Sequence, residues 1–141
     1  MAKIEAGSTR PLSPHLQIFR FYINMTMSIL HRMTGAANYF GILIPAAWLV
    51  AAASGQDSFN SVNGLFATPL GLLVLFGYSW SLIHHALGGI RHFIWDTGRG
   101  FDIGSVRTLS WVTIILSLGI TAAVWFFALT IYGVVKLTGA L

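Results

Sequence analysis

The chain has 141 residues, of which 55% are hydrophobic and only 9% charged, and its mean hydropathy is +0.74. Soluble domains carry about a quarter charged residues, so this composition excludes an ordinary soluble domain and predicts an integral membrane protein. The absence of cysteine excludes disulfides, cysteine-ligated zinc, iron–sulfur clusters and thioether-bound haem within the chain, so a metal must be held mainly by histidine. The net charge of +4 is then a guide to membrane topology rather than to nucleic-acid binding.

Residues 1–27 form the first predicted segment, ahead of any apolar run. No apolar stretch follows its first charges, as a secretory signal would require, and it contains Glu5 and few arginines, unlike a mitochondrial presequence. We therefore expect a chain that is inserted into the membrane as made, with residues 1–27 outside the bilayer.

Three membrane spans are predicted, over residues 28–53, 65–93 and 108–136. Their apolar parts, 33–53, 65–83 and 109–135, contain no Asp, Glu, Lys or Arg, and each reaches the roughly 20 residues that cross a bilayer as a helix. Pro45 is expected to kink the first helix, whereas Pro69 falls harmlessly in the first turn of the second. The predicted fold is an all-α, three-helix membrane anchor, whose small interior calls for a partner subunit.

The basic residues define the predicted orientation. Seven of the eight Lys and Arg residues lie in the N-terminal segment or around the loop between the second and third spans. The loop between the first two spans, residues 54–64, has none and carries Asp57. The positive-inside rule therefore places the N-terminus and the second loop in the cytoplasm.

This topology brings polar residues of two spans to one depth. Those at the start of the first span are Ser28, His31 and Arg32, and those towards the end of the second are His84, His85, Arg91 and His92. At about 1.5 Å per residue, His85 lies roughly 30 Å along the second helix from Phe66, near the inner edge of the hydrocarbon. Ionisable groups at such depths are functional candidates.

One face of the second helix is suited to a haem. It is formed by Ser81, His85, Gly88, Gly89 and His92. A histidine beside small residues leaves a flat depression for a planar macrocycle, which predicts a non-covalent b-type haem. The alternative for each of these histidines is an interfacial residue bonded to water or backbone.

His85 and His92 cannot be the two axial ligands of one iron. They are two turns apart on one face, about 10 Å, whereas opposite axial donors lie about 4 Å apart on metal–nitrogen bonds of about 2 Å. The second ligand must therefore come from His31 or from a partner chain.

Ser28 and Arg32 are four residues apart and share a helix face. Two such donors without a carboxylate nearby suit a quinone oxygen, a haem propionate or a lipid phosphate. The alternative is an arginine that snorkels to lipid headgroups. His31 is offset by about 100° from Arg32 and is expected to face a different neighbour.

Three blocks of sequence carry a family resemblance: "RPLSPHL" at 10–16, "SILHRMTG" at 28–35 and "HALGGIRHFIWD" at 85–96. Together they resemble the large cytochrome b membrane-anchor subunits of succinate dehydrogenase, respiratory complex II. The resemblance implies a heterodimer of two three-helix anchors that binds one haem b between them. It also implies docking to an iron–sulfur subunit and a flavoprotein with FAD, and electron transfer from succinate to ubiquinone.

The resemblance also implies roles for individual residues. His85 matches the axial haem ligand, with His92 setting the register against the neighbouring His84, and the second ligand comes from the small anchor subunit. His31 matches a residue near a haem propionate, and Arg32 is shared between haem and quinone.

The quinone-site residues implied by the resemblance are Ser28 and Arg32, with Ile29 in the same pocket and Phe21 as a weaker match. Asp96 is implied in proton delivery from the cytoplasm, and its alternative role is to cap the helix or pair with an arginine. "RPLSPHL" matches the segment under the iron–sulfur subunit, where His15 can be structural only.

Several alternatives stay open. The nearest is the anchor of a fumarate reductase, because one anchor does not set the direction of the reaction. Others are the b-type cytochrome subunit of another quinone-linked dehydrogenase, such as a hydrogenase or formate dehydrogenase, and a non-redox anchor or small transporter subunit. We expect a bacterial inner membrane, although a mitochondrially encoded chain would look similar.

Overall fold

The computed structural model describes residues 19–138, with side chains as far as Ile131. The described chain contains five helices and no strand: α1 (Ile23–Gly41), α2 (Leu43–Ser54), α3 (Gln56–Phe66), α4 (Pro69–Asp96) and α5 (Ile103–Thr138). Three helical stretches are long and apolar enough to cross a membrane, namely Ile23–Ser54, Pro69–Asp96 and Ile103–Ile131. The prediction of an all-α protein with three membrane helices is confirmed. The block at 10–16 lies outside the described residues.

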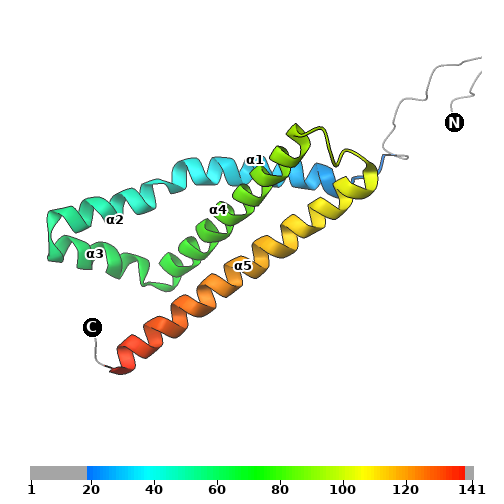
Figure 1. The fold of residues 1–141 in the computed structure, drawn as a ribbon. Helices are drawn as coiled ribbons and strands as arrows, with labels where there is room; N and C mark the ends of the chain where they lie inside the picture. The colour runs from blue at the N-terminus through cyan, green and yellow to red at the C-terminus, as the bar shows by residue number, and fades with distance from the viewer. Residues whose placement is uncertain (1–18, 139–141) are drawn as a thin grey trace, which may run out of the picture.

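The first span is interrupted where Pro45 requires it. α1 ends at Gly41 and α2 begins at Leu43, so the break lies three to four residues before the proline. A proline has no N–H for the carbonyl four residues earlier, here that of Gly41, and its ring clashes with that carbonyl. The predicted kink is therefore present, as a break at Ile42 beyond which α2 bends away from the line of α1 (Figure 1).

The predicted connection between the first two spans, residues 54–64, is mostly helical, because most of it belongs to α3. Phe59, Val62 and Phe66 recur at helical spacing and are the half-buried positions of this otherwise exposed helix. The ring of Phe66 lies 4.9 Å from that of Trp48 in α2, and Asp57 in the first turn favours the helix N-terminus. This apolar stripe is not apparent from composition, because most residues of the segment are polar.

The second span begins at Pro69, four residues later than predicted. Leu65 and Phe66 complete α3, and Thr68 then caps α4 by accepting a hydrogen bond from the Gly71 N–H at 3.1 Å. Pro69 occupies the first turn, where its missing N–H leaves no helical bond unmade, as predicted.

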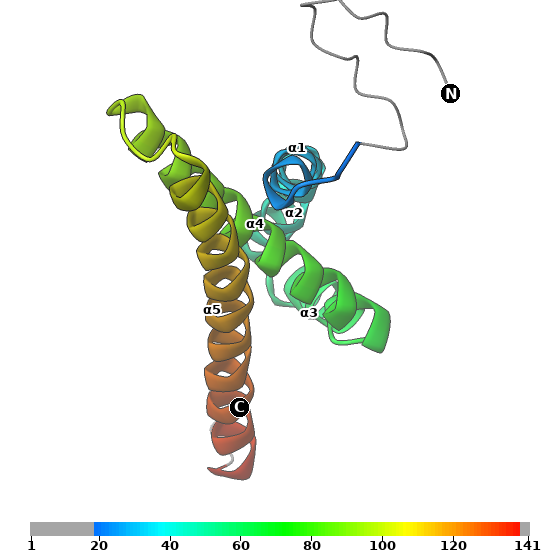
Figure 2. The ribbon, with the colours of Figure 1, turned by 90° about the vertical axis from the view of Figure 1, so that its right-hand side faces the viewer.

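α4 packs against both α1 and α5, and α1 also touches α5. Helices α1, α4 and α5 come together at one end of the molecule, where α1 begins, α4 ends and α5 begins. They spread apart towards the opposite end (Figure 1). Viewed along α1, α4 crosses between α1 and α5 (Figure 2). The start of the first span and the end of the second therefore lie at one end of the molecule.

The interior of the described chain is polar. Only Met27 and Ala51 are buried hydrophobic residues, whereas the buried polar residues are Thr34, Ser81, His84, Arg91, Ser110, Thr113, Ser117 and Thr121. Small polar side chains allow membrane helices to approach closely, and the large apolar side chains face outwards. Those outward faces are suited to lipid or to another membrane subunit.

Candidate functional site

The contact between α1 and α4 determines which candidate site residues of the two helices lie side by side. The hydroxyl of Ser81 donates to the carbonyl of Thr34 at 3.1 Å and to Oδ1 of Asn38 at 2.8 Å. These bonds hold the two helices antiparallel, so residues nearer the start of α1 meet residues nearer the end of α4. The predicted common depth of His31 and His85 is confirmed, because their ring centroids are 4.1 Å apart.

His85 is held by one ring nitrogen and leaves the other available. Its Nδ1 lies 3.1 Å from the carbonyl oxygen of His31 and 3.3 Å from Oγ1 of Thr34. The Thr34 hydroxyl donates to the Leu30 carbonyl at 2.8 Å, so the ring N–H of His85 donates to the His31 carbonyl. Nε2 then carries a lone pair and has no hydrogen-bond partner among the described residues. This is how proteins orient a histidine that ligates a metal.

His31 lies directly on His85. Their rings are parallel, with an interplanar angle of 1°, and the ring of His92 is tilted by 49° relative to that of His31, with ring centroids 5.2 Å apart. Nδ1 of His31 is buried and has no partner in the described chain. His31 thus faces α4 while Arg32 is exposed, as the offset between these two residues predicts.

The predicted flat depression beside His85 is partly wrong. Space beside Gly88 is filled by the imidazole of His31, because α1 packs on the same face of α4. Gly89, in contrast, has no heavy atom within 4 Å of where a Cβ would stand. Only Gly89 leaves open space next to the histidine.

The predicted quinone residues are exposed, in the first turns of α1 and just ahead of it. Ser28 and Arg32 are exposed and make no side-chain hydrogen bond to the described residues, and Ile29 and Phe21 are also exposed. Ser28 and Arg32 share one face of α1, as predicted, whereas Phe21 lies ahead of this helix. The described chain contains no carboxylate that pairs with Arg32.

Asp96 is the last residue of α4 and is exposed. It makes no ion pair with any described arginine, so the alternative of an arginine partner within residues 19–138 is not realised. The hydrogen bonds that end α4 come from Thr97 and Gly98, whose N–H groups reach the carbonyls of Ile94 and Trp95.

Two of the candidates at the end of the second span, to which the sequence analysis assigns no role, are buried on α4. His84 is 1% exposed, and its Nδ1 lies 3.1 Å from Oγ of Ser117 on α5. Arg91 is 4% exposed, its guanidinium carbon lies 5.1 Å from the centre of the Trp95 ring, and Nε and Nη1 have no hydrogen-bond partner in the described chain. In the sequence, the helical spacing of Ser110, Thr113, Ser117 and Thr121 indicates a polar face on α5. In the structure, α4 covers this face, so a buried polar contact between the two helices could be expected from that spacing.

The histidine cluster fits a haem better than a bare metal ion. No three His, Asp or Glu residues within 19–138 lie together as metal ligands. One imidazole that is oriented through Nδ1, and whose Nε2 has no hydrogen-bond partner among the described residues, suits a macrocycle that brings four ligands of its own.

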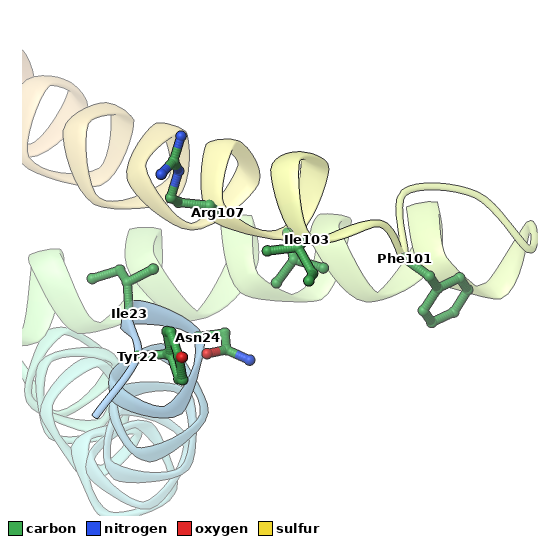
Figure 3. Close-up of a pocket in the computed structure, with 7 residues that line it drawn as sticks. Tyr22, Ile23, Asn24, Phe101, Ile103 and Arg107 are labelled. Atoms are coloured by element: carbon green, nitrogen blue, oxygen red, sulfur yellow. The ribbon is translucent and has the colours of Figure 1, made fainter. Parts of the chain in front are cut away.

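One cavity in the described part of the chain lies apart from these residues. It has a volume of about 510 Å³ and lies between the start of α1 and the start of α5 (Figure 3). It is lined by Tyr22, Ile23, Asn24, Phe101, Ile103, Val106 and Arg107. The Arg107 head points away from the α1 residues in Figure 3, so the facing walls are mainly apolar. None of the predicted site residues lines it.

Comparison with known proteins gives a consistent result. Residues 7–124 match the family described as succinate dehydrogenase/fumarate reductase transmembrane subunit. A succinate dehydrogenase cytochrome b556 subunit from Rickettsia felis is 37% identical over 87% of this chain and 96% of its own length. The b556 subunit of Paracoccus denitrificans is 40% identical over 73% of this chain and 78% of its own length. The mitochondrial cytochrome b560 subunit of Sus scrofa is 38% identical over 79% of this chain and 67% of its own length.

Proposed function

Since the chain belongs to the family of succinate dehydrogenase and fumarate reductase transmembrane subunits, it is a membrane anchor of respiratory complex II, and we propose that it binds a b-type haem together with a second anchor subunit and forms part of a ubiquinone-reduction site. The observation that carries the proposal is the free Nε2 of His85, whose Nδ1–H is held by the His31 carbonyl.

His85 is the proposed axial ligand from this chain. Its Nε2 would bind the haem iron, and the bond from Nδ1–H to a backbone carbonyl at 3.1 Å holds the ring in the tautomer that a metal requires. The bound haem supplies a one-electron carrier. His31 and Arg32 are the proposed neighbours of its propionates, and the small anchor subunit supplies the second ligand.

Ser28 and Arg32 are the proposed quinone-binding residues, with Ile29 and Phe21 against the ring. A serine hydroxyl can donate to one carbonyl oxygen, and a guanidinium stabilises negative charge that develops on that oxygen where little water is present. Their exposure on the outer face of α1 supports a pocket closed by other subunits. Asp96, exposed at the end of α4, is the proposed entry point for protons.

The proposed partners are the small anchor subunit, an iron–sulfur subunit and a flavoprotein with FAD. Residues 1–27 would lie under the iron–sulfur subunit on the cytoplasmic side of a bacterial inner membrane. The relatives described above are all named as succinate dehydrogenase subunits, which supports succinate oxidation rather than fumarate reduction.

Affinity purification of the complex through a tag on this chain tests the proposal. We expect four different subunits, FAD, a reducible b-type absorption spectrum and ubiquinone reduction that depends on succinate. A complex without a reducible b-type spectrum would overturn the haem assignment. Fumarate reduction with a low-potential quinol, at a higher rate than succinate oxidation, would favour the fumarate reductase alternative.

A further inference from the structure

The contact between α1 and α4 contains two glycines, each facing a histidine ring of the opposite helix. Gly88 on α4 faces His31 on α1, and Gly35 on α1 faces His85 on α4. We refer to these four residues as the glycine–histidine clasp. It sits at the level where the first span begins and the second ends.

A side chain at Gly88 would collide with the ring of His31. A Cβ at this position would overlap Nδ1 and stand 2.9 Å from Cε1 and 3.4 Å from Cγ of that ring. The ring is stacked on that of His85, with ring centroids 4.1 Å apart, and its centroid lies 5.2 Å from that of His92, so a shift of His31 disturbs both contacts. A methyl group at 88 would therefore displace the His31 ring that is stacked on His85.

A side chain at Gly35 would press on His85 directly. A Cβ there would stand 3.0 Å from Cε1 and 3.5 Å from Nδ1 of His85. Nδ1 is the atom that is bonded to the His31 carbonyl. The glycine thus leaves the ring free to take the position in which this bond forms.

We propose that Gly35 and Gly88 are positioning residues, which set the orientation of the His85 imidazole by admitting the two histidine rings between α1 and α4. The inference rests on the proposed role of His85 as a haem ligand. A ligand ring that is displaced or rotated changes the spectrum and reduction potential of its haem, because ligand geometry and hydrogen bonding tune the iron.

The test uses the purified complex with Gly88→Ala or Gly35→Ala, and Gly77→Ala as the matched control on α4. Gly77 has no heavy atom within 4 Å of a Cβ position. The readouts are haem per complex, the electron paramagnetic resonance spectrum of the oxidised haem and its midpoint potential. We expect both clasp variants to shift the resonance and the potential, with less haem bound in Gly88→Ala, and Gly77→Ala to match the parent complex.

A double-mutant cycle with His31→Ala identifies the collision itself. Without the His31 ring, a methyl at position 88 has space, so Gly88→Ala should then cause no further shift. If the complex with Gly88→Ala alone fails to assemble, the double variant still tests the proposal. Adding His31→Ala to Gly88→Ala should then restore assembly of the complex.

The two proposals fail differently. A parent complex without a b-type spectrum overturns the proposed haem function and this inference with it. A parent complex with haem, in which the clasp variants match Gly77→Ala or the effects of Gly88→Ala and His31→Ala simply add, overturns this inference alone.

Discussion

His84 and His85 are neighbours in the sequence but bind different helices. Nδ1 of His84 lies 3.1 Å from Oγ of Ser117 on α5, whereas Nδ1 of His85 lies 3.1 Å from the carbonyl of His31 on α1. One residue corresponds to about 100° around a helix, enough to turn two adjacent rings towards opposite neighbours. The Ser117 hydroxyl donates to the Ile114 carbonyl at 2.9 Å, so His84 is the donor in its bond to Ser117, and its Nε2 is enclosed.

This relationship predicts different outcomes for the two histidines. His85→Ala should remove most of the b-type absorption of the purified complex, since the ligand is lost. His84→Leu should keep the haem and destabilise the complex by about 1 kcal/mol, the usual scale of one hydrogen bond between membrane helices. Reduced-minus-oxidised spectra and thermal unfolding measure the two effects. Loss of haem in His84→Leu with retention in His85→Ala would reverse the assignment.

The proposed quinone face predicts graded losses of ubiquinone reduction. Ser28→Ala removes one neutral hydrogen bond, worth about 1 kcal/mol, and should lower kcat/KM for ubiquinone roughly 5-fold. Arg32→Leu removes a charged donor worth about 1.5–3 kcal/mol, for a loss of roughly 10- to 150-fold. Steady-state kinetics with a soluble ubiquinone measure both.

Controls for the quinone face come from the same chain. The control variants are Ser58→Ala, at an exposed position of α3, and Arg99→Gln, at an exposed position of the α4–α5 loop. Neither control should change kcat/KM for ubiquinone. Succinate oxidation with an artificial electron acceptor should be unchanged in all four variants, because the flavin does not lie in this chain. Full ubiquinone reduction by Arg32→Leu would refute the proposed role.

The hydrogen bonds that Asp102 accepts at the start of α5 predict that the stability of the first turn of this helix depends on pH. Its carboxylate accepts hydrogen bonds from Ser105, including the backbone N–H at 2.9 Å, and these hold the pKa of Asp102 below its usual value. A lowered pKa means that the cap contributes fully above the usual value of about 3.9 and is lost as pH falls through the lowered pKa. Asp102→Ala should therefore speed amide exchange at residues 103–106 at neutral pH, measured by hydrogen exchange and mass spectrometry. Asp102→Asn should retain most of the protection, because asparagine also caps helices.

Two glycines at the α3–α4 corner should respond to alanine in opposite ways. A Cβ at Gly71 would stand 2.6 Å from the Leu65 carbonyl oxygen and from Cα of Phe66, both rigid backbone atoms. Gly71→Ala should lower the free energy of unfolding by about 1–3 kcal/mol. Gly64, inside α3, has nothing within 4 Å, so Gly64→Ala should raise stability by about 0.5–1 kcal/mol. Thermal unfolding of the complex distinguishes them, and equal effects would contradict this packing.

The sequence by itself determined the features that depend on local periodicity and on distance along a helix. Runs of about 20 apolar residues specify membrane helices, because an unpaired backbone group in hydrocarbon costs several kcal/mol. A fixed rise per residue then places His31 and His85 at one depth, and a fixed turn places Ser28 and Arg32 on one face. These conclusions need no knowledge of which helices touch.

The tertiary structure alone decided which neighbour each face meets. The stripe of Gly88 and His85 appeared open in the sequence, yet α1 covers it and inserts His31 there. Arg91 appeared as a topology charge, yet it is buried at 4% exposure. The helix α3 in the connection between the first two spans packs on Trp48, and the composition of the segment does not indicate this contact. The rotation of one helix against another is set by side chains that are distant in the sequence, and local periodicity carries no information about it.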